Sequence, residues 1–164
     1  KYKFPEVDIH ANLTRSYPFG EVFAHVIGYT GLLSENDLHH VDPAKYRGTN
    51  VIGKYGIEKY YENTLRGNAG YEQVETDARG RMIRNLEQIA PTAGSNIYLS
   101  IDSKLQIAAY DALQNNKGAV VAIDTKTGGV LAIVSKPSFD PNLFVRGIPQ
   151  DIYTKLQNHV NQYP

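Results

Sequence analysis

Residues 118–142 read GAVVAIDTKTGGVLAIVSKPSFDPN, and this stretch decides the fold. It contains two apolar runs, 119–123 and 130–134, separated by a segment that supplies an aspartate and two glycines. Val and Ile favour strands, and Asp and Gly favour tight reversals, so the stretch predicts a β-hairpin. Because both runs are almost entirely apolar, we expect both faces of the hairpin to be covered inside a larger domain.

The turn of this hairpin contains Lys126-Thr127-Gly128, a triplet that penicillin-recognising serine enzymes use together with Ser-x-x-Lys and Ser-x-Asn. In those enzymes the triplet must lie on a strand beside the nucleophile, whereas here it falls in a predicted turn. No serine of the sequence is followed by lysine three residues later. We therefore interpret the triplet as a turn, and Ser34-Glu35-Asn36 as a chance match to a short pattern.

Composition limits the possible functions. The 164 residues can form one domain, or one domain and a fragment of another. The formal net charge is zero, so the sequence carries no electrostatic signature of nucleic-acid binding. There is no cysteine, which excludes disulfides and thiolate metal sites. There is also no run of 18 apolar residues, so a membrane anchor of the parent protein would lie outside this sequence.

Apolar periodicity and breaker residues predict a series of short elements outside the hairpin. We expect strands at 7–13, 70–74, 79–87 and 96–102, helices at 21–29, 53–67 and 103–115, and a polar loop at 31–49. In the helix at 103–115, Ser103 is the predicted N-cap. Its inward side chains are predicted to be Leu105, Ile107, Ala108 and Leu113.

The ionisable residues give little sign of catalysis. His25 is isolated, and the neighbouring side chains of His39 and His40 point in different directions, so neither predicts a metal site. We expect no metal, no cofactor and no catalytic residue. The alternative is a stand-alone enzyme that uses Glu58, His25 and Asp102, which requires these side chains to converge in one cleft.

Three blocks of motifs in a fixed order resemble the class B penicillin-binding proteins, and the tail of the hairpin resembles their elongation-type branch. The blocks are Arg15-x-Tyr17-Pro18-x-Gly20 with His25-Val26-Ile27-Gly28-Tyr29; Gly53-x-x-Gly56-Ile57-Glu58-x-x-Tyr61-Glu62-x-x-Leu65-x-Gly67-x-x-Gly70; and Leu99-Ser100-Ile101-Asp102-x-x-Leu105-Gln106 with the hairpin. Together they cover nearly the whole chain.

The resemblance implies an α+β fold. Residues 1–95 are expected to form the dimerisation or pedestal module, with antiparallel strands and packed helices. Residues 96–164 are expected to form a linking strand and helix and the opening hairpin of a truncated transpeptidase domain. The nucleophile block of the family, Tyr-Pro-Pro-Gly-Ser-x-x-Lys, is absent, and only Tyr163-Pro164 could match its beginning. This chain by itself should therefore be inactive.

The resemblance also implies a role for the parent protein. That protein would be a periplasmic peptidoglycan D,D-transpeptidase anchored in the inner membrane, which cross-links stem peptides during rod-shape maintenance. The part present here would support the catalytic domain. It would also bind a polytopic peptidoglycan glycosyltransferase and a periplasmic scaffold protein of the elongation machinery.

We expect nine residues to be structural, and all of them except Arg81 stand in the family blocks: Arg15, Tyr17, Pro18, Gly20, Gly53, Gly56, Glu58, Gly67 and Arg81. We expect Arg15, Glu58 and Arg81 to make charge-assisted bonds between blocks that are distant in sequence, although a direct contact with a partner is the alternative. The glycines of residues 53–70 are expected to act as a hinge.

Overall fold

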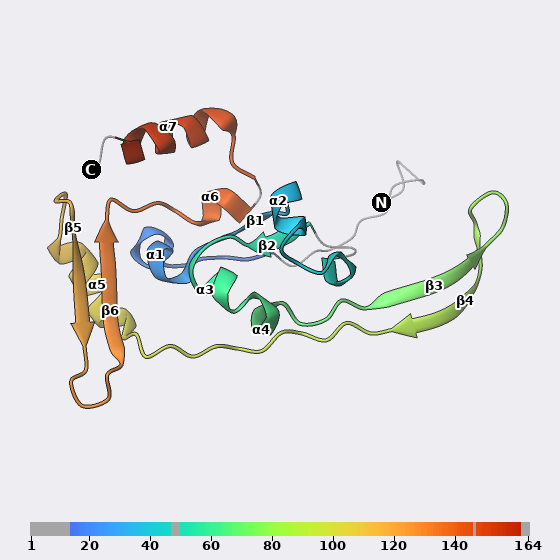
Figure 1. Ribbon diagram of the computed structural model, residues 1–164, viewed down its shortest axis with the longest axis horizontal. Coiled ribbons are helices and arrows are strands. Elements are labelled where there is room, and N and C mark those ends of the chain that lie inside the picture. The colour runs from blue at the N-terminus through green and yellow to red at the C-terminus, as the bar shows by residue number, and fades with distance from the viewer. Residues whose placement is uncertain (1–13, 47–49, 146, 162–164) are drawn as a thin grey trace, which may run out of the picture.

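The computed structural model describes residues 14–46, 50–145 and 147–161, so the strand expected at 7–13 lies outside the described residues (Figure 1). The architecture is α+β, as predicted, with three antiparallel strand pairs and several short helices. The pairs are β1 (Thr30–Leu32) with β2 (Val51–Gly53), β3 (Tyr71–Thr76) with β4 (Met82–Ile89), and β5 (Gly118–Ile123) with β6 (Val130–Lys136).

Nine helical elements lie in the described part of the chain, and most have only one turn. The α-helices are α1 (Ala24–Ile27), α2 (Glu35–Leu38), α3 (Gly56–Tyr60), α4 (Glu62–Arg66), α5 (Ser103–Ala112), α6 (Asn142–Val145) and α7 (Gln150–Asn161). Two 3-10 helices, η1 (Gly20–Val22) and η2 (Pro43–Tyr46), complete the set. Helix α1 lies between α3 and β6 and so connects the middle of the molecule to the β5–β6 hairpin.

The predicted hairpin at 118–136 is confirmed. Its turn is held by Asp124, which accepts hydrogen bonds from the Lys126 N–H (2.9 Å) and the Thr127 hydroxyl (2.7 Å). The prediction that both faces of this hairpin are covered is wrong, because the described residues cover only one face. Helix α5 packs against β6 and buries Ala132 and Val134, whereas Val121 on β5 stays 56% exposed.

Helix α5 confirms the helix predicted at 103–115, but its N-cap and its buried side chain differ from the prediction. Asp102, rather than Ser103, is the N-cap, because its carboxylate accepts hydrogen bonds from the N–H groups of residues 104 and 105. The inward face centres on Gln106, which is fully buried, while Leu105 is exposed. The segment 96–102 does not form the expected strand: Asp102 donates one backbone hydrogen bond to β6, and no ladder follows among the described residues.

The segments before residue 70 are more broken than predicted. The helix expected at 21–29 is reduced to η1 and α1, and the loop expected at 31–49 contains β1, α2 and η2. Ser34 is the N-cap of α2 in a capping box with Asp37, so the Ser-x-Asn match is structural. The single helix expected at 53–67 divides into α3 and α4 at Tyr61, and Gly53 belongs to β2.

Strands β3 and β4 form the predicted hairpin around residues 77–80 and project away from the rest of the molecule (Figure 1). Arg81 lies at the tip of this hairpin, where its guanidinium contacts Asp77 at 2.8 Å. The prediction that Arg81 joins distant blocks is therefore wrong. An aspartate four residues away in the same turn is its partner, and its side chain is largely exposed.

Candidate functional site

The first family block and α3 meet in a buried polar junction around Glu58. The Glu58 carboxylate lies 3.0 Å from the Arg15 guanidinium nitrogen Nε and accepts a hydrogen bond from the Tyr17 hydroxyl at 3.3 Å. That hydroxyl in turn accepts a hydrogen bond from the Thr30 N–H at 3.0 Å. Three segments that are distant in sequence are therefore connected through one carboxylate that is only 5% exposed.

Burial dominates the electrostatics of this junction. It raises the pKa of the Glu58 carboxyl above its ordinary value, and the Arg15 charge and the Tyr17 hydroxyl offset this rise only in part. Burial also raises the pKa of the Tyr17 phenol, and the negative charge of Glu58 adds to that rise. The arrangement suits a structural connection, because the Glu58 carboxylate, the Arg15 guanidinium and the Tyr17 hydroxyl each have a partner inside the protein. The Thr30 hydroxyl, in contrast, is buried without a hydrogen-bond partner among the described residues.

Gly56 and Gly28 allow the backbones of α1 and α3 to touch. Both have positive φ values, +60° and +77°, and a Cβ added at Gly56 would lie 2.6 Å from the Val26 carbonyl oxygen. A Cβ at Gly28 would overlap the Tyr55 carbonyl. A tilt of α3 would have to break this backbone contact, and the expected hinge stays a prediction.

The side-chain amide of Asn142 clamps Tyr17. Its Oδ1 accepts a hydrogen bond from the Tyr17 N–H at 2.9 Å, and its Nδ2 donates to the Tyr17 carbonyl, also at 2.9 Å. Asp140 fixes this amide by accepting hydrogen bonds from its Nδ2 (2.8 Å) and from the Asn142 N–H (2.9 Å). Residues 125 positions apart are thus held in register.

Gln106 makes a second clamp from α5. Its Oε1 accepts a hydrogen bond from the Ile133 N–H (2.8 Å), and its Nε2 donates to the carbonyls of Ile133 (2.7 Å) and Val22 (2.9 Å). The amide therefore bonds both backbone groups of one residue on β6 and also holds η1. A fully buried side chain joins the N-terminal segment to the hairpin.

Further contacts join the segment around Glu21 to α5 and to the residues that follow β6. Glu21 accepts hydrogen bonds from the Tyr110 hydroxyl at its carboxylate (2.7 Å) and from the Ser138 hydroxyl at its backbone carbonyl (2.6 Å). On the neighbouring surface, the Tyr29 ring stacks on Phe144 with centroids 4.2 Å apart, and Phe139 packs edge-on against both.

The structure brings together only some of the nine predicted residues. Arg15, Tyr17 and Glu58 form the junction, and Gly53 and Gly56 allow the backbone to pass close to it. Pro18 and Gly20 follow Tyr17, and Gly20 lies opposite Asp140. Gly67 lies apart, against residues 92–94, and Arg81 lies on the projecting hairpin.

Sequence reasoning missed Thr30, Gln106 and Asn142 as members of this network. Gln106 and Asn142 both stand inside the family blocks. These blocks were the available signal for both residues, and Asn142 also follows an aspartate by two positions.

The alternative of a stand-alone enzyme is not supported by the placement of its three residues. Glu58 belongs to the junction, His25 Nε2 lies 3.0 Å from the Pro137 carbonyl oxygen, and Asp102 caps α5. No hydrogen bond or ion pair joins any two of them in the described part of the chain. A catalytic dyad requires such contact, so these residues form no catalytic group.

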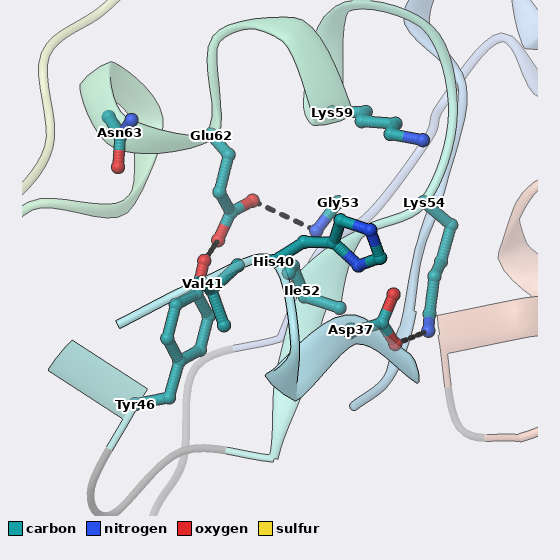
Figure 2. A pocket seen from close by; sticks show the side chains of 10 residues that line it. All are labelled: Asp37, His40, Val41, Tyr46, Ile52, Gly53, Lys54, Lys59, Glu62 and Asn63. Atoms are coloured by element: carbon teal, nitrogen blue, oxygen red, sulfur yellow. Dashed lines mark hydrogen bonds and ion pairs between the residues drawn. The ribbon is translucent and has the colours of Figure 1, made fainter. Parts of the chain in front are cut away.

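A cavity of about 380 Å³ lies on the other side of α3, between α2, β2 and α4 (Figure 2). Glu62 spans it, accepting hydrogen bonds from the Gly53 N–H (2.8 Å) and the Tyr46 hydroxyl (3.2 Å). Lys54 pairs with Asp37 at its edge. The partners of Asp37 lower the pKa of its carboxyl to about 2 against the opposing effect of burial.

The described residues contain neither a candidate membrane span nor a group of metal-ligating side chains. No helix in the ranges 14–46, 50–145 and 147–161 is long and apolar enough to cross a membrane. Within the same ranges, no three His, Cys, Asp or Glu side chains are grouped so that they could hold a metal ion.

Comparison with protein families gives two matches. Residues 1–99 match the penicillin-binding protein dimerisation domain, and residues 118–163 match the penicillin-binding protein transpeptidase domain. Among curated relatives, peptidoglycan D,D-transpeptidase MrdA of Acinetobacter baumannii is 50% identical over 99% of this chain, and that of Escherichia coli K12 is 46% identical over 98%. The chain spans 24% and 26% of the length of these relatives.

Solved structures agree with this assignment. A crystal structure of Pseudomonas aeruginosa PBP2 in complex with WCK 5153 aligns with a TM-score of 0.74 at 47% identity, covering 88% of this chain and 28% of that one. A complex of PBP2 with MreC from Helicobacter pylori aligns with a TM-score of 0.76 at 34% identity, covering 90% and 27%. The chain therefore belongs to the penicillin-binding protein family, in which it resembles penicillin-binding protein 2 and comprises the dimerisation domain and the start of the transpeptidase domain.

Proposed function

We propose that this chain is the non-catalytic, periplasmic part of a peptidoglycan D,D-transpeptidase, which supports the catalytic domain and binds partners of the elongation machinery. Residues 1–95 would be the supporting module, and residues 96–164 would begin the catalytic domain. The parent protein would be anchored in the inner membrane and would act on peptidoglycan stem peptides through the remainder of its catalytic domain.

The network between residues 17–29 and 106–144 is the observation that carries this proposal. Two amide clamps, the hydroxyl contacts to Glu21 and the Tyr29 aromatic cluster all cross from the first family block to the hairpin. The Gln106 amide is fully buried, so a shift between the two segments would leave it unpaired, and it therefore fixes one relative arrangement. The part-buried Asn142 clamp and the exposed hydroxyl contacts to Glu21 add to this connection. The supporting module would therefore hold the beginning of the catalytic domain rigidly in place.

A structure of a related protein supports the choice of partner. The Helicobacter pylori relative has been solved in complex with MreC. An equivalent periplasmic scaffold protein is accordingly the first partner that we assign to this chain. A polytopic glycosyltransferase is the second, and it rests on the family resemblance alone.

The support role is tested by replacing Asn142 with Ala in the full-length protein. The variant should bind the scaffold protein normally but acylate a fluorescent penicillin more slowly, because the Tyr17 backbone loses both hydrogen bonds to the Asn142 side chain and keeps only the turn bond from the Gly20 N–H. Asn116→Ala, at a residue that follows α5, is a matched control and should acylate at the wild-type rate. Equal acylation and equal thermal stability of the two variants would contradict the support role.

The non-catalytic role of the chain itself has a direct test. The purified 164-residue polypeptide should form no covalent adduct with a fluorescent penicillin, because no Ser-x-x-Lys motif is present. A stoichiometric band that survives boiling and denaturing electrophoresis would show that a nucleophile exists in this sequence.

A further inference from the structure

A second cavity, of about 340 Å³, lies beside the polar junction and is lined by residues of β1, β2, α3 and α4. Thr30 of β1 belongs to this lining and is only 5% exposed. Its hydroxyl oxygen Oγ1 is buried and has no hydrogen-bond partner in the described part of the chain. Leaving a buried hydroxyl unpaired costs free energy and is rare in folded proteins, so this oxygen indicates a bound ligand.

The charges around the cavity favour a neutral ligand. Two arginines and two glutamates line it, namely Arg15, Arg66, Glu58 and Glu62, and their formal charges cancel. Arg15 pairs with Glu58, and both oxygens of Glu62 already accept hydrogen bonds from protein groups. A charged ligand would therefore meet both signs of charge and gain little net attraction.

The polar atoms that remain free at the junction include donors as well as acceptors. Glu58 uses only Oε1, which contacts Arg15 Nε and the Tyr17 hydroxyl, so its Oε2 has no partner within the described ranges. Arg15 uses only Nε there, so its two Nη groups stay available as donors. The Thr30 hydroxyl can donate or accept. Water donates and accepts at once, and the cavity exceeds the roughly 10–15 Å³ that one water molecule needs.

We propose that this cavity holds an ordered water molecule, which bonds the Thr30 hydroxyl and connects it to the charged pair of Arg15 and Glu58. Thr30 is then attached to the junction twice, through this water and through its N–H, which donates to the Tyr17 hydroxyl at 3.0 Å. The site explains why threonine, rather than valine of the same shape, occupies a buried position of β1. The inference is independent of the proposed function, because it concerns only how the junction is completed.

The test is the isosteric substitution Thr30→Val in the full-length protein. Valine keeps the shape of threonine and removes the hydroxyl, so the bound water and its other partners lose a hydrogen bond. We expect the equilibrium constant for unfolding in urea to rise about fivefold or more. Thr76→Val, at an exposed position of strand β3, is the matched control for the strand preference of valine and should change this constant less than about twofold.

A hydroxyl that binds nothing predicts the opposite sign. Thr30→Val would then lower the unfolding constant relative to Thr76→Val, because removing an unpaired buried hydroxyl relieves its cost, and this result would overturn the proposal. Equal effects of the two substitutions would overturn it as well.

A crystal structure of the full-length wild type gives a second, independent measurement. It should show a water oxygen about 2.8 Å from Thr30 Oγ1. A protein group in that place, contributed by another part of the parent protein, would assign the hydroxyl to that group and would remove the water site while leaving the proposed function intact.

Discussion

Replacing Gln106 with Met should destabilise the protein by breaking the clamp between η1, α5 and β6. Methionine has nearly the same length and volume as glutamine, so packing is conserved while three hydrogen bonds to Val22 and Ile133 are lost. At about 1 kcal/mol for each bond, the loss is about 3 kcal/mol, and it rises to about 5 kcal/mol if two of the backbone groups stay dry and unpaired. Burial of the apolar methylthio group offsets about 1 kcal/mol of this loss of stability.

We therefore expect the free energy of unfolding to fall by at least about 2 kcal/mol. The measurement is urea unfolding of the full-length protein, followed by far-ultraviolet circular dichroism and by the fraction that still acylates a fluorescent penicillin. Gln88→Met, on the exposed strand β4, is the control and should change stability by less than about 0.5 kcal/mol. A loss below about 0.5 kcal/mol in Gln106→Met, with an unchanged denaturant slope, would refute the reasoning.

The remaining predictions concern backbone contact, pH dependence and the triplet in the turn. Gly56→Ala should severely destabilise the protein in thermal melts, because its Cβ would collide with the Val26 carbonyl. Gly80→Ala has a similar positive φ but open space around it, so this control should lose only about 1 kcal/mol of stability. Equal losses in the two variants would exclude the collision as the cause. The pKa of Asp37 is lower in the folded state than in the unfolded state, so its contribution to stability is complete above about pH 4 and disappears as the pH falls towards 2. Asp37→Asn should therefore reduce the loss of unfolding free energy between about pH 4 and pH 2. An unchanged loss over that pH range would contradict the pairing of Asp37 with Lys54. Lys126→Ala should leave penicillin acylation of the full-length protein within about threefold, under 1 kcal/mol of barrier, and a hundredfold loss in a folded variant would place the turn at the active site.

Elements closed by local hydrogen bonds could be predicted from the sequence. The β5–β6 hairpin depends on Asp124, which bonds residues two and three positions away, and the β3–β4 hairpin depends in the same way on Asp77. The family blocks likewise identified Arg15, Tyr17 and Glu58 before their contacts were visible. In each case the residue types alone carry the signal, because turn chemistry and motif spacing do not depend on the rest of the fold.

The tertiary structure decided what those residues contact. Gln106 appeared to be an ordinary position in an amphipathic helix, and only the placement of β6 and η1 around it made a buried amide favourable, with partners 27 and 84 residues away. Arg81 had the same charge and the same apparent role as Arg15, yet it found a partner within its own turn. Long-range pairing depends on which backbone groups are left unsatisfied when the elements pack, and a sequence read by itself does not contain that information.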